Sequence, residues 1–228
     1  MSKKKSKRYQ EEEKKIDAKK VYTPAEALQL IKEGTKTKFD QSVEVHIRLG
    51  IDPKAPDQIV RGGVVLPHGT GQSKKIIAFV TPDLVEEAKK AGADLIGDDE
   101  TINTIRTSGR CDFEVAVAVP QVMKKLGPVA RILGQKGLMP NPKNETVTTN
   151  VAKTIADIKK GKANFRSDDS GNVHQVIGKV SFETKHLEEN FSTLIDAIQK
   201  AKPDSLKGTF FNIVSLCSSM GPSIRVKP

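Results

Sequence analysis

Short apolar runs that alternate with helix-forming stretches dominate the middle of this 228-residue chain, and they constrain its fold more than any other feature. The runs are Lys75–Val80, Asp94–Ile96 and Phe113–Val119. Runs this short and apolar are typical of strands buried on both faces of a parallel sheet. Helices are expected at 81–91, at 98–108, from Pro120 onward and at 150–160. Strands separated by helices of about ten residues predict βαβ units, hence a parallel sheet with helices on its faces.

The flanks of the chain show a different pattern, in which strands have one apolar and one polar face. Apolar and polar residues alternate strictly from Ser42 to Leu49, which predicts a half-buried strand with Val60–Leu66 as its partner. Two short strands on either side of Asp168–Gly171 predict a hairpin. Further elements are expected as a helix at His186–Lys200, a strand at Thr209–Cys217 and an edge strand at Ser223–Val226.

Two Thr-Pro pairs predict helix starts. Thr23 is followed by Pro24 and, three residues on, by Glu26, which is the pattern of a capping box, so a helix is expected to Gly34. Thr81 is expected to cap the helix at 81–91 in a similar way, because Thr is a good N-cap and proline suits the first helical position.

Each flank is small and mostly half-buried, which predicts that the two flanks pack together as one domain. The sequence therefore favours a discontinuous α+β domain made of residues 1–67 and 160–228. Residues 68–159 would form a second, α/β domain inserted into the first. The fold class is thus a combination of α/β and α+β in two domains.

The net charge of +10 is concentrated in the flanks. Residues 68–159 carry 13 Lys/Arg and 11 Asp/Glu, whereas the flanks carry 25 and 17, and the first 20 residues alone hold 9 cations and 4 anions. Clustered basic charge is typical of proteins that bind a polyanion, most often nucleic acid. The run Lys3–Arg8, taken alone, fits a solvated tail equally well.

The segment Arg131–Lys143 combines two glycines, two prolines and three cations. Gly134 and Gly137 permit positive φ, and Pro140 and Pro142 exclude helix. These residues predict a rigid, basic loop without regular structure. An ordinary surface loop is the simpler interpretation on composition alone.

Several classes of protein are disfavoured. No apolar run approaches 18 residues, so no membrane span is expected, and the basic start lacks the apolar segment of a secretory signal. Cys111 and Cys217 lack CxxC spacing, which argues against a zinc site or a disulfide and fits a reducing cytoplasm. The histidines, which are His46, His68, His174 and His186, show no metal-ligand spacing.

Catalytic and ligand-binding motifs are also missing. His68–Lys75 resembles a phosphate loop, but it lacks GxxxxGK[ST] and precedes a strand instead of following one. Asp168–Asn172 hints at a calcium loop, but Lys179 stands where an EF-hand needs glutamate. No GxSxG turn is present. The sequence predicts no enzyme, no cofactor and no metal.

The composition also limits how the chain could bind RNA. Aromatic residues make up only 4% and tryptophan is absent, which argues against modules that stack bases on aromatic side chains. Small polar groups and bare backbone would have to read RNA shape, phosphates and 2′-hydroxyls. The segment from Ser215 to Gly221 fits that requirement, although a bulge before an edge strand is the simpler interpretation.

Five blocks of the chain, in family order, resemble the bacterial ribosomal protein L1 family over nearly the whole length. They are Lys38–Asp40 with Ser42–Val45, Arg61-Gly62 with Leu66–Gly69, Gly137–Lys143, Gly178–Phe182 and Ser219–Arg225. The resemblance implies a discontinuous α+β terminal domain with an inserted Rossmann-like three-layer α/β domain. It also implies a cytoplasmic protein of the large ribosomal subunit that binds the stalk region of large-subunit rRNA. Release of deacylated tRNA from the exit site and repression of its own operon by binding its mRNA are further implied.

The resemblance also implies which residues contact RNA, and all of them lie in the flanks. They are Lys38, Phe39, Glu44, His174, Gly178, Lys179, Ser181, Ser219, Met220 and Gly221. The lysines would neutralise phosphates, the two large apolar side chains would contact riboses, the serines would bond hydroxyls and the glycines would allow close approach. Glu44 would accept hydrogen bonds from 2′-OH or base amino groups. Ser219 departs from the threonine usual in the family, but it keeps the hydroxyl.

The alternative hypothesis is a nucleotide-dependent enzyme that uses the βαβ insert and is tethered to RNA by the basic flanks. Such an enzyme needs a glycine-rich turn after a strand and charged groups at the carboxyl ends of the strands. The sequence offers neither clearly.

Overall fold

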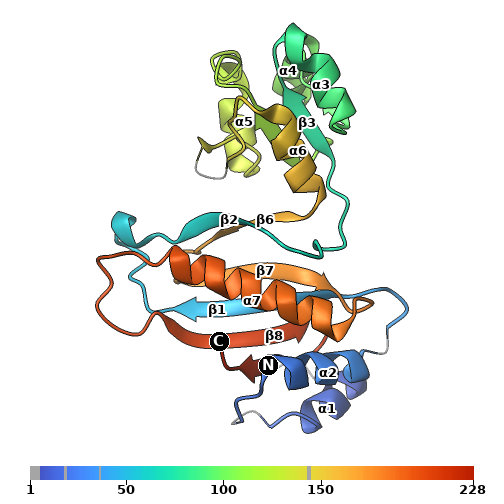
Figure 1. The fold of residues 1–228 in the computed structure, drawn as a ribbon, viewed down its shortest axis with the longest axis vertical. Helices are drawn as coiled ribbons and strands as arrows, with labels where there is room; N and C mark the ends of the chain where they lie inside the picture. The colour runs from blue at the N-terminus through green and yellow to red at the C-terminus, as the bar shows by residue number, and fades with distance from the viewer. Residues whose placement is uncertain (1–5, 18–19, 36, 143–144) are drawn as a thin grey trace. The chain divides into compact units, whose positions relative to one another are not determined.

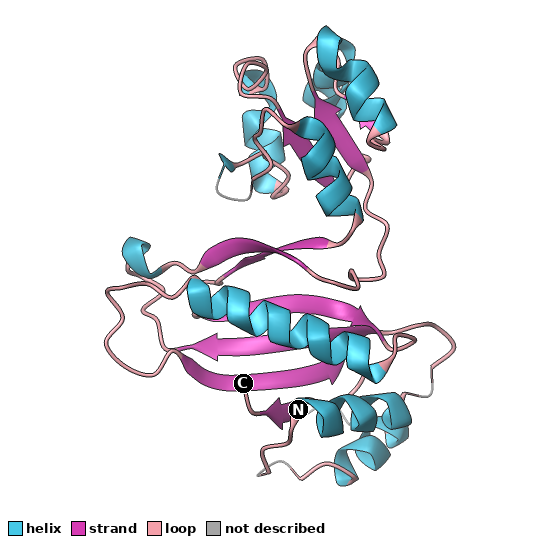
Figure 2. Ribbon diagram, viewed as in Figure 1, coloured by secondary structure: helices cyan, strands magenta, loops and turns pink. Residues whose placement is uncertain are grey.

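The structure, a computed structural model, describes residues 6–17, 20–35, 37–142 and 145–228. It is a mixed α/β protein that divides into two compact units, and each unit combines helices with strands (Figure 2). The terminal unit joins Met1–Gly71 to Ala163–Pro228, and the inserted unit is Gln72–Lys162. The basic residues Lys3–Lys5 and Lys143, on which predictions were placed, lie outside the described residues.

The terminal unit contains a four-stranded antiparallel sheet in the order β7-β1-β8-β9. Its strands are β1 (Ser42–Leu49), β7 (Asn172–Lys179), β8 (Phe211–Ser218) and β9 (Ile224–Val226). In β1 the apolar side chains at alternate positions, from Val43 to Leu49, are buried. The intervening Glu44, His46 and Arg48 are half-buried or exposed, which confirms the predicted half-buried strand.

Helix α7 (Thr184–Lys200) lies across one face of this sheet (Figure 1). Its buried side chains recur at the spacing of one helix face and include Leu187, Phe191, Leu194 and Ile198. Helix α2 (Pro24–Gly34) packs beside α7 and against β8 and β9. A further helix, α1 (Lys7–Lys14), is capped by Ser6 and was not predicted. The apolar face of the sheet therefore forms the core, and Glu44, His46 and Arg48 lie on the opposite face.

Two strand pairings differ from the predictions. Strand β2 (Arg61–Val65) pairs with β6 (Lys162–Arg166) and not with β1. The turn at Asp168–Gly171 does form, with the Asp168 N–H donating to the Asn172 carbonyl at 2.8 Å, but β6 and β7 leave it into different sheets. Both edges of β1 are occupied by β7 and β8, so β2 and β6 satisfy their backbone groups by pairing with each other.

The inserted unit is built on a parallel sheet in the order β4-β3-β5. Its strands are β3 (Ile76–Phe79), β4 (Leu95–Ile96) and β5 (Val115–Ala118), and its helices are α3 (Val85–Lys90), α4 (Asp99–Ser108), α5 (Ala130–Gln135) and α6 (Val151–Lys159). Side chains of α4 and α5 pack with Phe79 in one buried cluster, and those of α3 and α6 pack with Val117 in another. Helices therefore cover both faces of this sheet.

Two predictions within the inserted unit are wrong. No continuous helix follows Pro120; turns lead to a 3-10 segment, Gly127–Val129. The segment from Arg131, expected to be an irregular loop, begins as helix α5, because the fully buried Leu133 anchors it to the core. Gly137 ends this helix at φ 70°, and the Leu138 N–H donates to the Leu133 carbonyl at 2.8 Å, as in a Schellman motif.

The two Thr-Pro helix starts differ in their capping. The Thr23 hydroxyl accepts from the Glu26 N–H at 3.3 Å, and the Glu26 carboxylate accepts from the Thr23 N–H at 3.1 Å, so the predicted capping box is confirmed. The bond from the Thr23 backbone also lowers the pKa of Glu26. Thr81 stands at the N-cap position with proline in the first turn, as predicted, but the turn it opens is the 3-10 segment Pro82–Leu84 before α3, and its side chain makes no capping hydrogen bond.

This difference provides a matched pair of substitutions. Thr23→Ala should lower the free energy of unfolding by about 1 kcal/mol, because the cap of α2 is lost. Thr81→Ala should change it by less than about 0.5 kcal/mol, since no cap is removed. Urea denaturation followed by circular dichroism measures both values, and an equal loss in the two variants would contradict the assignment.

Candidate nucleic-acid interface

Three segments of the terminal unit meet where β1 begins and β7 and β8 end. Ser42 pairs with Lys179, and Val43 pairs with Gly178 on one side and with Ser218 on the other. This register brings together residues 37–41, 178–182 and 218–222. Nine of the ten predicted contact residues lie in these segments or at the adjoining start of β1, and His174 lies further along β7.

Gln41 holds the three segments together. Its side chain is 2% exposed, donates to the Thr37 hydroxyl at 2.9 Å and accepts from the Met220 N–H at 3.0 Å. Its backbone carbonyl accepts from the Val180 N–H at 2.9 Å. Sequence reasoning missed this residue, since a single glutamine before a strand carries no local signal.

Ser219 is bonded to the start of β1. Its N–H donates to the Ser42 carbonyl at 3.1 Å, and its hydroxyl accepts from the Ser42 N–H at 3.3 Å. The same hydroxyl lies 3.4 Å from a Glu44 carboxylate oxygen. Ser219 thereby fixes the segment that follows β8 and orients the carboxylate beside it.

Lys179 and Ser181 are also held by groups of the protein. The Lys179 Nζ donates to the Ser42 hydroxyl at 2.9 Å. Ser181 donates from its N–H at 3.2 Å and from its hydroxyl at 2.7 Å to the Asp40 carboxylate. Asp40 belongs to one of the family blocks but was not among the predicted contact residues, and the structure shows that it positions Ser181. The polar groups of the site are therefore ordered before any partner binds.

Lys38, Phe39 and Met220 project from this ordered base. Phe39 and Met220 are 55% and 53% exposed, and Lys38 is exposed beside Phe39. From α1, the Arg8 guanidinium donates to the Met220 carbonyl at 3.3 Å and lies 3.6 Å from a Glu12 carboxylate oxygen. Exposed apolar side chains next to cations suit a partner that offers riboses and phosphates.

The two glycines of the site have packing reasons to be glycine. A Cβ on Gly178 would lie 2.6 Å from Leu187 Cδ2 and 3.0 Å from Phe182 Cδ2, on the core side of the sheet. A Cβ on Gly221 would lie 2.4 Å from Ser218 Oγ. These contacts explain both residues from within the fold, and close approach of RNA at either one stays a prediction.

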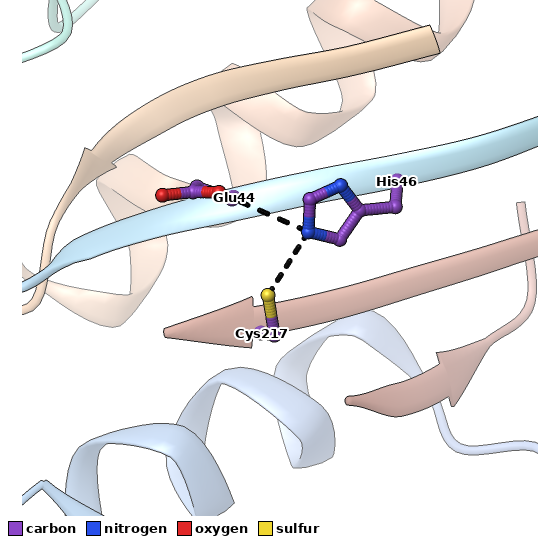
Figure 3. Close-up of side chains that lie close together, drawn as sticks. All are labelled: Glu44, His46 and Cys217. Atoms are coloured by element: carbon purple, nitrogen blue, oxygen red, sulfur yellow. Dashed lines mark hydrogen bonds and ion pairs between the residues drawn. The ribbon is translucent and has the colours of Figure 1, made fainter. Parts of the chain in front are cut away.

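His174 belongs to a group of side chains on the polar face of the sheet. Its Nδ1 lies 2.7 Å from Nδ1 of His46, which is its cross-strand neighbour, and His46 Nε2 lies 3.1 Å from Cys217 Sγ. His46 also faces Glu44 (Figure 3). Burial, followed by the nearby His174, lowers the pKa of His46. Burial, followed by Glu44, raises the pKa of Cys217 to about 11.

The lowered pKa of His46 makes stability depend on pH. Its ordinary pKa is 6.5, so below that pH the unfolded state takes up a proton that the folded state resists, and the free energy of unfolding should fall. The free energy of unfolding of His46→Gln should decline less steeply than that of the wild type from about pH 7 to about pH 5. Urea denaturation followed by tyrosine fluorescence reports on the terminal unit, which contains Tyr9 and Tyr22. Equal slopes for the two proteins would contradict the assigned shift.

The alternative enzyme hypothesis requires a ligand site at the carboxyl ends of the parallel strands of the inserted unit. A crevice of about 580 Å³ lies there, but Asp98, Asp99 and Glu100 line it. Lys125 is 3.1 Å from Asp99 and is thereby neutralised. No glycine stands directly after β3, which is followed by Val80, Thr81 and Pro82. These carboxylates disfavour the phosphates of a nucleotide.

In the described part of the chain, no helix combines the length and apolarity that crossing a membrane requires.

Comparisons with known proteins point to one family. Residues 31–222 match the profile described as "Ribosomal protein L1p/L10e family". The "Large ribosomal subunit protein uL1" of Macrococcus caseolyticus strain JCSC5402 is 50% identical over 225 residues, which is 99% of this chain and 97% of the relative. Proteins of the same description from Mycobacteroides abscessus and Thermobifida fusca strain YX are 49% and 48% identical, each over 99% of this chain and 95% of the relative.

Proposed function

This chain belongs to the ribosomal protein L1 family, and from that premise we propose that it binds the lateral-stalk region of large-subunit rRNA. It is a structural protein of the large ribosomal subunit in the cytoplasm and not an enzyme, as the matches over nearly its full length indicate. The sequence-based identification of the family and of a non-catalytic role is thereby confirmed.

The observation that carries the proposal is the ordered base around Gln41 from which Lys38, Phe39 and Met220 project. Lys38 and Lys179 neutralise phosphates of the bound RNA. Phe39 and Met220 pack against riboses and exclude water from the contact. Recognition of this kind needs few aromatic side chains, in keeping with their content of 4%.

The remaining predicted contacts add hydrogen bonds to the same surface. Glu44 accepts from 2′-hydroxyls or base amino groups, and its contact with Ser219 holds the carboxylate in place. Ser181 and His174 offer further polar groups, and Ser219, Gly178 and Gly221 shape the backbone. A protein that discriminates RNA from DNA must bond the 2′-hydroxyl, which a fixed carboxylate accomplishes.

The two units have different roles in this proposal. The terminal unit is the RNA-binding domain, of residues 1–67 and 160–228 in the boundaries predicted from the sequence. The inserted unit, 68–159 in those boundaries, is a Rossmann-like three-layer α/β domain, and its parallel sheet with helices on both faces supports that assignment. The family resemblance also implies that the protein takes part in the release of deacylated tRNA from the exit site, and this role is part of the proposal.

The same surface supports repression of the protein's own operon. An mRNA that folds like the stalk rRNA presents the same riboses and phosphates, so it competes for Phe39, Met220 and the lysines. The protein then represses translation when free rRNA is exhausted. An mRNA leader that does not compete with the rRNA fragment for the protein would remove this part of the proposal.

A binding titration tests the central part of the proposal. The full chain is titrated with the stalk fragment of large-subunit rRNA, with an unrelated RNA of equal length as competitor, at two salt concentrations. Specific recognition predicts tight binding that survives the competitor and moderate salt. Binding that falls equally for both RNAs would leave only counterion release by a basic protein and would refute the proposal.

A further inference from the structure

We propose that the polar face of the terminal sheet contains a site for one zinc ion, with Glu44, His46 and Cys217 as its ligands (Figure 3). One ligand atom from each of these side chains lies within 4.8 Å of the other two. The sequence predicted no metal site because His46 and Cys217 are 171 positions apart. Pairing of β1 with β8 places Glu44 directly opposite Cys217 and makes the three side chains neighbours.

The distances suit a tetrahedral metal ion. Zinc binds sulfur at about 2.3 Å and imidazole nitrogen at about 2.0 Å, which places tetrahedral ligand atoms roughly 3–4 Å apart. Here His46 Nε2 lies 3.1 Å from Cys217 Sγ and 3.8 Å from a Glu44 carboxylate oxygen. Small side-chain rotations therefore suffice to enclose an ion, and the strand backbones need not move.

The neighbouring side chains present His46 in the protonation state that a metal requires. His174 Nε2 lies 3.5 Å from an Asp168 carboxylate oxygen, which favours the tautomer with its proton on Nε2 and with Nδ1 as an acceptor. His46 Nδ1, at 2.7 Å, donates to that acceptor. The lone pair of His46 Nε2 then points at Cys217 and Glu44. Such a second layer, in which a ligating histidine donates its other N–H, is typical of metal sites.

The set of ligands indicates which ion would bind. A thiolate, an imidazole and a carboxylate suit zinc, whereas magnesium and calcium require oxygen ligands. Cys217 binds as the thiolate, so its S–H proton leaves to solvent as the S–Zn bond forms, and zinc affinity should rise with pH. Side chains of Glu44 and His46 are about one-third exposed, so an ion can enter from solvent.

A calorimetric titration tests the site. Zinc is added to the full chain, with its cysteines reduced and without an affinity tag. We expect one zinc ion per chain, loss of binding in Cys217→Ser and unchanged binding in Cys111→Ser, which removes the other cysteine. His174→Ala should weaken zinc binding by about tenfold or more, as loss of a second-layer partner usually does. This inference does not depend on rRNA binding, so each can fail without the other.

Cobalt supplies a second readout that does not require Cys217→Ser to fold. In Cys111→Ser the thiol of Cys217 is the only one left, so a sulfur-to-cobalt charge-transfer band on addition of Co²⁺ must come from Cys217. The proposal predicts that band, and predicts that Zn²⁺ abolishes it by displacement. A folded chain that binds no zinc, zinc affinity unchanged by Cys217→Ser, or the absence of the cobalt band would each overturn the proposal.

Discussion

Replacing Phe39 and Met220 together by alanine should weaken binding to the stalk rRNA fragment by at least about 2 kcal/mol, which is about thirtyfold in Kd. Both side chains are more than half exposed in the free protein, so the loss falls on the complex and not on the fold. Each would cover apolar ribose surface in the complex, and burial of a large apolar side chain is worth about 1.5–3 kcal/mol. The Kd measured by titration at fixed salt gives the value directly.

A matched control is the double variant Val65→Ala with Leu95→Ala. These side chains are 43% and 41% exposed and lie outside the three segments, so their removal should leave the Kd unchanged. A substitution at Gly221, such as Gly221→Val, would be a poorer test of this surface. Its side chain would clash with Ser218, so a folding defect would be mixed with a binding defect. Equal affinity of the Phe39/Met220 variant and the wild type would refute the assignment of this surface.

Leu187→Ala should lower the free energy of unfolding of the terminal unit by about 3 kcal/mol. Leu187 is fully buried on α7, where it lies against the bare Cα of Gly178, and its truncation leaves a cavity between helix and sheet. Ser192→Ala, on an exposed position of the same helix, should change the value by less than about 0.5 kcal/mol. Urea denaturation followed by tyrosine fluorescence reads the terminal unit alone.

The same position allows a double-mutant cycle with Gly178→Ala. Alone, this substitution should destabilise, because the new methyl group would lie 2.6 Å from Leu187 Cδ2. In the Leu187→Ala background the closest of these contacts is removed and only the contact with Phe182 at 3.0 Å is left, so the cost should be smaller by about 0.5 kcal/mol or more. If the losses of the free energy of unfolding are strictly additive, contact with Leu187 is not the reason that position 178 requires glycine.

Local pattern was sufficient to predict elements whose signal lies within a few residues. The alternation in Ser42–Leu49 identified β1, and the capping box at Thr23 identified the start of α2. Partner choice was not local: β2 pairs with β6 because β7 and β8 already occupy both edges of β1. Helix α1 was missed because it buries none of its side chains, so no apolar periodicity marks it.

The candidate site divides in the same way. Motif resemblance supplied Ser219, Met220 and the other proposed contacts, which stay predictions until RNA binding is measured. The groups that hold them, Gln41 and Asp40, act across segments distant in the chain and could not be inferred from a pattern. The proximity of His46 to Cys217 likewise depends on strand register, which no spacing rule contains.

The most direct test of the proposed RNA-binding surface is hydrogen–deuterium exchange of the full chain with and without the stalk rRNA fragment. RNA should protect backbone amides in 37–44, 178–182 and 218–222, with the rest of the terminal unit little changed. Protection confined to 72–162, with none at these three segments, would contradict the proposal and would move the RNA-binding surface to the inserted unit.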